Sequence, residues 1–511
     1  MVRENMGSAG DTCRACGANN GETGGWSDVT FEPAGENAKE YNRGSPLCRL
    51  PPIRFPPPAS VSHPELVPMR KMMALGLTMF AVGAAAEAPR PVSSPQQPSE
   101  GWTPIFDGRS LDGWYARPHL DPRKFAAMDD RERRQKLEQW SEEAAQHWSI
   151  EDGVLINDGA GPYLVTAKDY SDYDLMLEYK TVPRADSGIY LKGTPQVQIW
   201  DSTDEKKFRL GAHLGSGGLW NNRPGSQGKD PSELADRPFG QWNQVRIRQV
   251  GARTTVELNG KRVVDHARME NYWDRDRPLF RSGPIILQTH GGEIRWRNLA
   301  VKELEPTEAN DWLASDRAKA FTSLLNGRDL EGWQGATDSY EIADGVLRCK
   351  PGEGGNLLTE KEYTDFVIRL EFRLPPGGNN GLAIRAPLEG NPAYAAMCEL
   401  QVLDSTHPKF ANLDPRQYHG SAYGIAAAER GFLRPTGQWN FQEVTVNGSR
   451  VQVELNGSLI LNTDLSEVTQ FMADRSHPGI DRTRGFFGFA GHSDPVEFRN
   501  VAIRELPEQG R

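Results

Sequence analysis

Apolar and polar residues alternate with a period of two along much of the chain after residue 100. In "DLMLEY" (174–179), Leu175, Leu177 and Tyr179 fall on one face. A period of two is typical of strands that bury one face and expose the other. The same alternation marks "VQIW" (197–200) and "NQVRIRQV" (243–250).

Turn signals separate these strands. "LNG" precedes Lys261 and again precedes Ser458, and Asn-Gly is the strongest short signal for a β-hairpin. Many short strands with few intervening helices predict an all-β fold of the β-sandwich or jelly-roll type.

One segment has helical periodicity instead. Residues 121–147 predict an amphipathic helix lying on a sandwich, with Asp129 as its N-cap. The apolar positions at spacings of three and four are Leu137, Trp140, Ala144 and Trp148.

A long pattern occurs twice, at an offset of about 200 residues. The matching stretches are "FDGRSLDGW" (106–114) with "LNGRDLEGW" (325–333), "VELNGK" (256–261) with "VELNGS" (453–458), and "HGGEIRWRNLAVKEL" (290–304) with "HSDPVEFRNVAIREL" (492–506). A repeat of this length predicts two tandem domains, 101–305 and 321–507, joined by a linker at 306–320. The helical segment has no counterpart in the second copy.

The stretch that closes each copy changes register. Ile294 and Trp296 are at even positions, whereas Leu299 and Val301 are at odd positions, so in a regular strand the two pairs would point to opposite faces. One extra residue would restore both faces, so we expect a β-bulge at Arg297–Asn298 and at Arg499–Asn500.

The start of the chain reads as a targeting segment. Residues 69–88 contain two basic residues, an apolar run and then small residues, the order of a secretory signal peptide. We therefore expect 1–68 to be an extension upstream of the true start, and 89–100 to be a flexible Pro/Ser-rich linker. The alternative is an uncleaved signal anchor, which would be the protein's one membrane association. Cleavage implies a secreted or periplasmic bacterial protein.

Cysteine usage implies no disulfide framework. Cys13, Cys16 and Cys48 lie in the extension, and Cys349 and Cys398, free or paired, remain in the mature chain.

Composition excludes some classes of function. The chain has 59 basic and 69 acidic residues, a net charge of −10. This balance, without a basic stripe, argues against a nucleic-acid binder. No phosphate-binding glycine loop, nucleophile elbow or zinc-spacing motif occurs.

Several motifs together identify a resemblance. "NGRDLEGW", "ADGVL", "LLTEKEYTDFVIRLEFRLPPGGNNGLAIR", "ELQVLDS", "GSAYG" and "FRNVAIREL" make each copy similar to the 3-keto-disaccharide hydrolase family. The resemblance implies a concanavalin A-like jelly roll with a carbohydrate-sized groove. It also implies cleavage of 3-keto-glycosides by removal of the C2 proton, elimination of the C1 substituent and addition of water. Such a site needs a base, an acid, and donors or a divalent cation such as calcium to hold the enolate. The sequence does not establish a cation, but Asp201, Asp404 and Asp494 could supply oxygen ligands.

The second copy offers the fuller acid–base inventory. Glu399 and Gln401 share one face of a predicted strand, with Asp404 where the strand ends. Two polar side chains on one face indicate either a lined groove or a solvent-facing surface. We take Glu399, His492 and Asp404 as catalytic candidates, although a lone histidine is often structural.

Further residues of the second copy are candidate substrate-binding groups. Asp494 would orient His492, and Tyr423 would stack on a sugar or be a core aromatic. The full set is Gln401, Arg385, Tyr423, His407 and Asp494.

The first copy differs at the central position. Gln196 stands where the second copy has Glu399, and an amide cannot shuttle a proton. The first copy is therefore either a binding site or a site with another base. Its candidate substrate-binding residues are Gln196, Gln198, Asp201, Trp220, Gln288 and His290.

Three functions fit these residues. The first is a carbohydrate-active enzyme cleaving 3-keto-glycosides, and the second is a non-catalytic, lectin-like carbohydrate-binding protein. The third, a conventional glycosidase, would need two carboxylates facing each other across the groove, and no strand supplies such a pair. The sequence leaves the sugar and the oligomeric state open.

Overall fold

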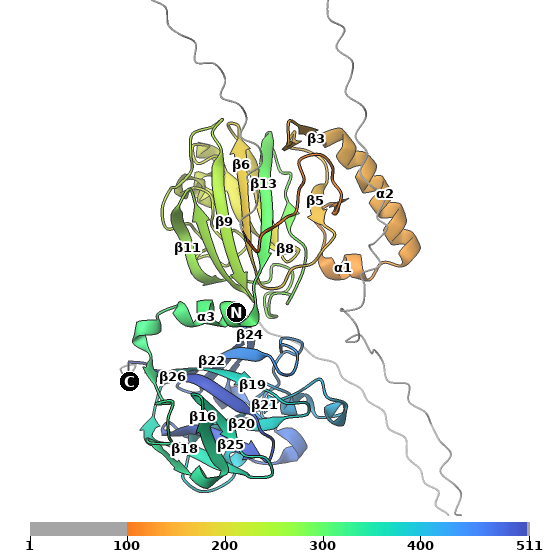
Figure 1. The fold of residues 1–511 in the computed structure, drawn as a ribbon. Helices are drawn as coiled ribbons and strands as arrows, with labels where there is room; N and C mark the ends of the chain where they lie inside the picture. Colours follow the sequence, from red (N-terminus) through yellow and green to blue (C-terminus); the bar gives the residue numbers. More distant parts are fainter. Residues whose placement is uncertain (1–99, 508–511) are drawn as a thin grey trace, which may run out of the picture. The chain divides into compact units, whose positions relative to one another are not determined.

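The computed structural model describes residues 100–507. Four antiparallel sheets make up two β-sandwiches, one for each sequence repeat (Figure 1). The predicted extension, signal peptide and residues 89–99 lie outside the described residues, as do Cys13, Cys16 and Cys48. Among the described residues, no helix has the length and apolar character needed to cross a membrane.

The first sandwich pairs a large sheet with a five-stranded one. The large sheet runs in the order β11 (Lys261–Arg268), β10 (Arg253–Leu258), β9 (Asn243–Val250), β6 (Tyr173–Thr181), β13 (Ile294–Glu303), β4 (Val154–Asn157) and β3 (Trp148–Glu151), and β1 (Thr103–Pro104) pairs with β13. The five-stranded sheet runs β2 (Trp114–Arg117), β5 (Tyr163–Thr166), β12 (Ile286–Leu287), β7 (Asp186–Leu191) and β8 (Thr194–Trp200).

The second sandwich repeats this topology strand for strand. Its large sheet runs β16 (Tyr340–Ala343), β17 (Val346–Cys349), β26 (Glu497–Glu505), β19 (Phe366–Arg373), β22 (Trp439–Asn447), β23 (Arg450–Leu455) and β24 (Ser458–Asp464), and β14 (Thr322–Ser323) pairs with β26. Its five-stranded sheet runs β15 (Trp333–Gly335), β18 (Gly354–Tyr363), β25 (Gly485–His492), β20 (Asn379–Ala386) and β21 (Cys398–Leu403). The fold is thus two tandem jelly-roll sandwiches of the concanavalin A-like type, as predicted.

Each core lies between its two sheets. Leu175, Leu177 and Tyr179 of β6 are buried in the first core, as their parity predicts. In the second core, Phe489 and Phe498 face each other from opposite sheets, with ring centroids 4.2 Å apart. Cys349 and Cys398 are buried and free.

The predicted turns and bulges are confirmed. The Asn-Gly pairs at 259–260 and 456–457 both adopt positive φ at both residues, the conformation of a tight hairpin turn. The pairing of β13 with β6 shifts register after Arg297, and that of β26 with β19 shifts beside Arg499. Asn298 and Asn500 take positive φ there, at 55° and 52°.

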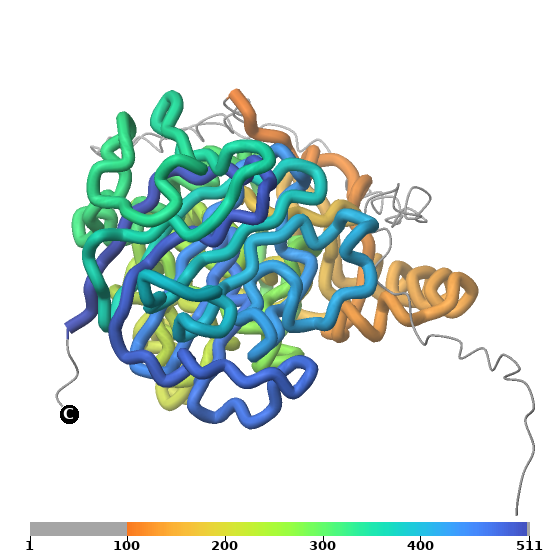
Figure 2. Tube along the Cα trace, turned by 90° about the horizontal axis from the view of Figure 1, so that it is seen from below, coloured from red at the N-terminus to blue at the C-terminus, as the bar shows by residue number. Residues whose placement is uncertain are grey.

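The helical insertion of the first sandwich forms two helices, α1 (Pro122–Ala126) and α2 (Asp130–His147). Asp129 caps α2 by accepting the N–H groups of Arg131 (2.9 Å) and Glu132 (2.8 Å), so the predicted cap is confirmed. The insertion lies at one edge of the sandwich (orange in Figures 1 and 2). Trp148, which we expected on the helix, instead begins β3 and is buried.

The segment predicted as a linker contains helix α3 (Pro306–Ser315). Proline suits the first helical turn because its missing N–H would be unpaired there. Ala309 and Leu313 of α3 pack in one apolar cluster with Val250 and Phe441. The linker is therefore an ordered, packed element.

Short helices occupy the remaining loops. They are α4 (Pro392–Ala395) and the 3₁₀ turns Glu205–Leu210, Ala212–Leu214, Ala318–Ala320, Thr337–Ser339, Pro408–Phe410, Pro415–Gln417, Leu465–Glu467 and Met472–Asp474.

Candidate functional site

The five-stranded sheet of each sandwich carries buried polar residues on its outer face, the face turned away from the core. In β21, Leu400 and Val402 enter the core, so Glu399 and Gln401 lie on the outer face. In β8, Val197 and Ile199 likewise enter the core. Gln196 and Gln198 therefore take the places of Glu399 and Gln401. We call these two outer faces the first and second polar faces.

Glu399 dominates the second polar face. Its side chain lies across Gly381 of β20, so closely that a Cβ on Gly381 would fall 2.0 Å from Oε1. Only 3% of the residue is exposed. Burial raises the pKa of the carboxyl to about 7, and the nearby backbone N–H of Ala393 in α4 lowers it only in part. Among the described residues, no arginine, lysine or histidine forms an ion pair with Glu399.

Ala383, the residue of β20 that pairs with Glu399, belongs to an apolar cluster. The cluster consists of Leu358, Ala383, Ala386 and Ala396, with Phe486 packed against it. A carboxyl without a cation in apolar surroundings favours its neutral form, which explains the raised pKa. Such a group, near neutrality at physiological pH, is suited to take or give a proton.

Polar groups flank Glu399. Gln401 donates to Asn379 Oδ1 at 2.5 Å. The backbone N–H of Tyr423 donates to the Glu399 carbonyl at 2.8 Å. The Tyr423 hydroxyl accepts from Gln417 at 3.0 Å, so its own proton is available. Tyr423 and Gln401 thus lie next to Glu399 along the backbone, and their role in binding a substrate stays a prediction.

A buried histidine also belongs to this region. His477 Nδ1 is 2.8 Å from the carbonyl of Ala393, the residue whose N–H lies beside Glu399. Its Nε2 is buried without a hydrogen-bond partner, and burial lowers the pKa of the ring. His477 lies in the irregular loop between β24 and β25, where no strand periodicity marks it as a site residue.

On the first polar face, Gln196 stands in place of the carboxyl, and its side chain begins a series of hydrogen bonds between amides. Gln196 Nε2 donates to Gln198 Oε1, and Gln198 Nε2 donates to Asp186 at 2.8 Å. Asp186 is paired with Lys207 at 2.7 Å. The one carboxylate in this series of hydrogen bonds, that of Asp186, is therefore neutralised by a lysine.

Trp220 occupies the position of Tyr423. Its backbone N–H donates to the Gln196 carbonyl at 3.2 Å, as that of Tyr423 does to Glu399. The indole meets Trp200 edge-on at 5.0 Å, and Lys229 Nζ lies 3.7 Å above it. Lys229 therefore covers one face of this ring.

Aromatic residues that the sequence analysis missed line the other end of the first polar face. Gln288 Nε2 is 3.4 Å from the hydroxyls of both Tyr163 and Tyr190. The rings that contact His119 are Tyr163, Tyr190, Tyr272 and Trp273, at centroid distances of 4.8–6.1 Å. Tyr190 could have been found, since it has the parity of Gly188 on β7.

Asp404 and Asp201 hold loops together. Asp404 accepts the N–H of Gly377 (2.8 Å) and the N–H and hydroxyl of Thr406 (3.1 and 2.6 Å). Asp201 accepts the N–H of Arg184 and both groups of Thr203 in the same way. Desolvation opposes ionisation of each carboxyl, but these hydrogen bonds lower both pKa values.

His492 lies on the same face as Glu399 but far along it. Ala383 of β20 pairs with Glu399 on one side and with Gly488 of β25 on the other, so Gly488 is level with Glu399. His492 lies four residues further along β25. Sheet geometry places their backbones about 16 Å apart. The exposed His492 ring contacts the Ala490 carbonyl at 2.9 Å rather than Asp494. His290 is similarly exposed at the end of the first polar face.

Arg385 and His407 have structural partners. Arg385 takes positive φ (49°) where the β20–β25 register shifts. Its guanidinium binds the carbonyls of Thr364, Gly448 and Arg482 and the carboxylate of Asp365. It is thus turned away from the substrate role we predicted. His407 caps a 3₁₀ turn by accepting the N–H of Lys409.

The described residues do not fit a divalent cation. They contain no group of three or more His, Cys, Asp or Glu side chains placed to hold one. The carboxylates of Asp201 and Asp404 are occupied by backbone and threonine donors, and Asp494 is not brought to either.

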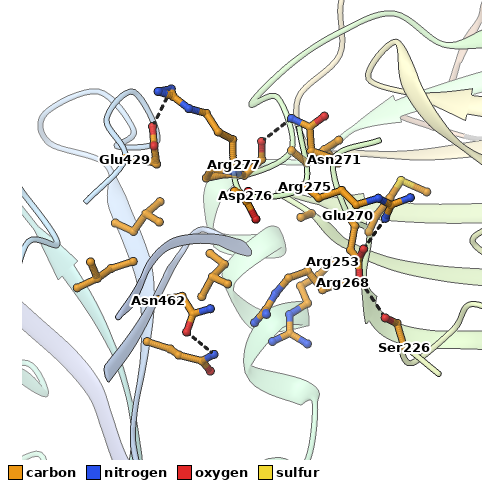
Figure 3. Close-up of a pocket in the computed structure, with 18 of the residues that line it drawn as sticks. Ser226, Arg253, Arg268, Glu270, Asn271, Arg275, Asp276, Arg277, Glu429 and Asn462 are labelled. Carbon is orange, nitrogen blue, oxygen red and sulfur yellow. Dashed lines mark hydrogen bonds and ion pairs between the residues drawn. The ribbon is translucent and has the colours of Figure 1, made fainter. Parts of the chain in front are cut away.

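A separate pocket of about 820 Å³ lies elsewhere in the chain (Figure 3). Arginines and acids line it, among them Arg253, Arg268, Glu270 and Glu429. None of the predicted site residues contributes to it. Its charged groups are largely paired with one another, as Arg275 is with Glu270 at 2.7 Å.

These features define a tandem jelly-roll protein with a buried carboxyl on one polar face and a chain of amides on the other. Residues 101–302 and 320–504 match the 3-keto-alpha-glucoside-1,2-lyase-like domain, and the chain belongs to this family. It is 25% identical to the 3-keto-disaccharide hydrolase of Bacteroides thetaiotaomicron over 246 residues, 40% of this chain and 85% of that protein.

Two solved structures give a coarser likeness. One, from Parabacteroides distasonis and assigned as a glycosyl hydrolase, is 25% identical, with a TM-score of 0.33, and the match covers 36% of this chain and 99% of that one. The other is a carbohydrate-binding module from Bacillus subtilis, 13% identical, with a TM-score of 0.24 over 35% of this chain and 98% of that one.

Proposed function

We propose that the second sandwich is a secreted hydrolase that cleaves 3-keto-glycosides, with Glu399 as the base. The ketone at C3 acidifies the C2 proton, which Glu399 removes to give an enolate. The enolate then collapses, the C3 carbonyl re-forms, and a C1–C2 double bond appears as the C1 oxygen leaves. That oxygen takes a proton, and water adds across the double bond, with hydroxyl at C1 and hydrogen at C2.

The observation that carries this proposal is the state of Glu399. A carboxyl with a pKa of about 7 is a far stronger base, once ionised, than an ordinary glutamate. It is also the group that the first polar face lacks, since Gln196 stands at that position. Tyr423, whose backbone N–H binds the Glu399 carbonyl and whose hydroxyl proton Gln417 leaves free, is our candidate donor to a substrate oxygen.

Membership of the family supports the substrate class. The Bacteroides thetaiotaomicron relative is named for 3-keto-disaccharide hydrolysis. The ketone is the feature that makes a single base sufficient, since a conventional glycosidase needs a second carboxyl. Export rests on the signal-like sequence of residues 69–88.

The test uses the full chain and both anomers of 4-nitrophenyl 3-keto-glucoside, with release of nitrophenol followed by absorbance. We expect Glu399→Gln to lower kcat/KM by about 10²–10⁴-fold. Glu467→Gln, an exposed glutamate of the same sandwich, is the matched control and should retain the rate. In D₂O the released sugar should carry deuterium at C2.

Two results would refute the proposal. The first is an unchanged rate for Glu399→Gln. The second is equal cleavage of the parent glucoside without the ketone, because elimination then has no acidic C2 proton to use.

A further inference from the structure

The first polar face holds two buried amide oxygens without partners. Gln196 Oε1 and Gln288 Oε1 accept no hydrogen bond from the described residues, and the two residues are only 4% and 5% exposed. A buried acceptor left unpaired costs about 1–3 kcal/mol. Two such groups at one place therefore indicate a ligand that supplies donors.

Both oxygens converge on one point above Gly188. A Cβ on Gly188 would fall 2.8 Å from Gln196 Oε1 and 3.1 Å from Gln288 Oε1. The glycine is not required by backbone conformation, since its φ is not in the left-handed region. The absence of a side chain at Gly188 leaves space between the amide groups of Gln196 and Gln288.

The groups around this point suit a sugar. Gln288 Nε2 faces the hydroxyls of Tyr163 and Tyr190. These hydroxyls also interact with each other, so one tyrosine proton remains to donate to a ligand. A ligand that both donates and accepts at neighbouring atoms, as vicinal sugar hydroxyls do, would satisfy acceptors and donors together. The exposed rings of His119 and Tyr272 add an apolar wall beside them.

The helical insertion builds part of this wall. His119 lies in the segment leading into α1. Arg123 of α1 binds Asp274 at 3.2 Å and the Trp273 carbonyl at 3.3 Å. It thereby fixes the loop that carries Tyr272 and Trp273. The second sandwich has no such insertion, and it has Ala490 where the first has Gln288.

The same face has no base comparable to Glu399. Its carboxylate, Asp186, is held by Gln198 and Lys207, and the central position is an amide. We propose that the first polar face binds a neutral saccharide ring without cleaving it, through Gln196, Gln288 and the aromatic wall. This deepens the proposed function, on which it rests for the ligand class, by assigning binding to one sandwich and chemistry to the other.

The test separates the two faces with matched glycine variants of the full chain. Gly381→Ala places a methyl group against Glu399 and should close the second polar face. In this background, binding of sucrose and of 3-keto-sucrose is measured by calorimetry. We expect one remaining site, and we expect Gly188→Ala added to Gly381→Ala to weaken it at least tenfold.

A second pair of substitutions guards against misfolding. Gln196→Ala with Gln288→Ala, in the Gly381→Ala background, should also weaken binding at least tenfold while the circular dichroism spectrum is retained. Absence of saccharide binding in the Gly381→Ala protein, or binding that survives both sets of changes, would overturn the inference. Turnover is a separate readout. If Gly381→Ala still cleaves 3-keto-sucrose, the assignment of chemistry to Glu399 fails, whatever the binding result.

Discussion

Gln196 and Glu399 occupy the same position in the two sandwiches. The carbonyl of each accepts the backbone N–H of an aromatic residue from the adjacent loop, Trp220 in the first and Tyr423 in the second. The side chain of each lies over a glycine of the neighbouring strand. One fold therefore presents an amide and a carboxyl in matching surroundings, and only the carboxyl can transfer a proton.

The rate of cleavage should rise with pH through the pKa of Glu399. Burial raises this pKa to about 7, and the base acts only when ionised. We expect kcat/KM for 3-keto-glucoside to fall tenfold per pH unit well below 7 and to level off above it. Glu399→Asp, which keeps a carboxyl but withdraws it, should retain a pH-dependent residual rate, whereas a profile that is flat between pH 5 and 8 would contradict the assignment.

Glu399 should also make the fold less stable at high pH. Its pKa rises from 4.5 in the unfolded chain to about 7 in the folded one, so the folded state binds the extra proton between these values. Stability attributable to this group is thus greatest below pH 4.5 and declines as pH rises towards 7. The loss is on the order of 3 kcal/mol.

Glu399→Gln removes the free-energy cost of ionising a buried carboxyl. Its free energy of unfolding, measured in urea, should exceed that of the parent protein at pH 8 and converge with it near pH 4. A variant that is less stable at pH 8 would show that the ionised carboxyl has a stabilising partner. Such a result would leave Glu399 as a structural residue.

Asp404 and Asp201 should behave alike when replaced by alanine. Each accepts three hydrogen bonds that hold a loop at the end of the strand carrying the central residue. Removing either acceptor should lower the free energy of unfolding by about 2 kcal/mol or more. Thermal unfolding of both variants checks this. If Asp404→Ala instead abolishes turnover with an unchanged Tm, Asp404 takes part in the chemistry.

Alternation along the strands was enough to predict the architecture and the face on which Glu399 and Gln401 lie. Glu399 and Gln401 are set by the parity of Leu400 and Val402, and the bulge at Arg499–Asn500 follows from a slip in that parity. The same rule failed at Arg385, because a register shift and a positive φ turn its side chain towards Asp365.

The rest of the site depends on contacts between distant segments. His119 contacts Tyr272 although the two lie 153 positions apart in the sequence, and the insertion whose Arg123 holds the Tyr272 loop has no repeat partner. His477 likewise reaches Ala393 from a loop far along the chain. Contacts between distant segments leave no periodic pattern within a strand. Sequence patterns could therefore identify the sheet, but not the loop residues that surround its polar face.

The buried Glu454 should control how the two sandwiches unfold. It lies on β23 and binds Arg253 Nε at 2.7 Å and Arg268 Nη2 at 2.6 Å, both from the first sandwich. Burial alone would raise the pKa of Glu454, but the two arginines outweigh it and hold the value at about 2. Its contribution to stability is therefore present above pH 4.5 and is lost as pH falls from 4.5 towards 2.

Replacing Glu454 by glutamine leaves two arginines without their counter-ion, which costs about 3–5 kcal/mol for a buried pair. We expect calorimetry of Glu454→Gln at pH 7 to resolve two transitions, one for each sandwich, where the parent protein shows one. Glu497→Gln, which removes a buried glutamate that pairs with Arg348 and Arg373 inside the second sandwich, is the matched control and should keep a single transition. If both variants unfold as the parent does, the ion cluster adds nothing to the coupling. The other contacts must then carry it, among them the apolar packing of α3 against Val250 and Phe441 and the ion pair of Arg434 with Asp172.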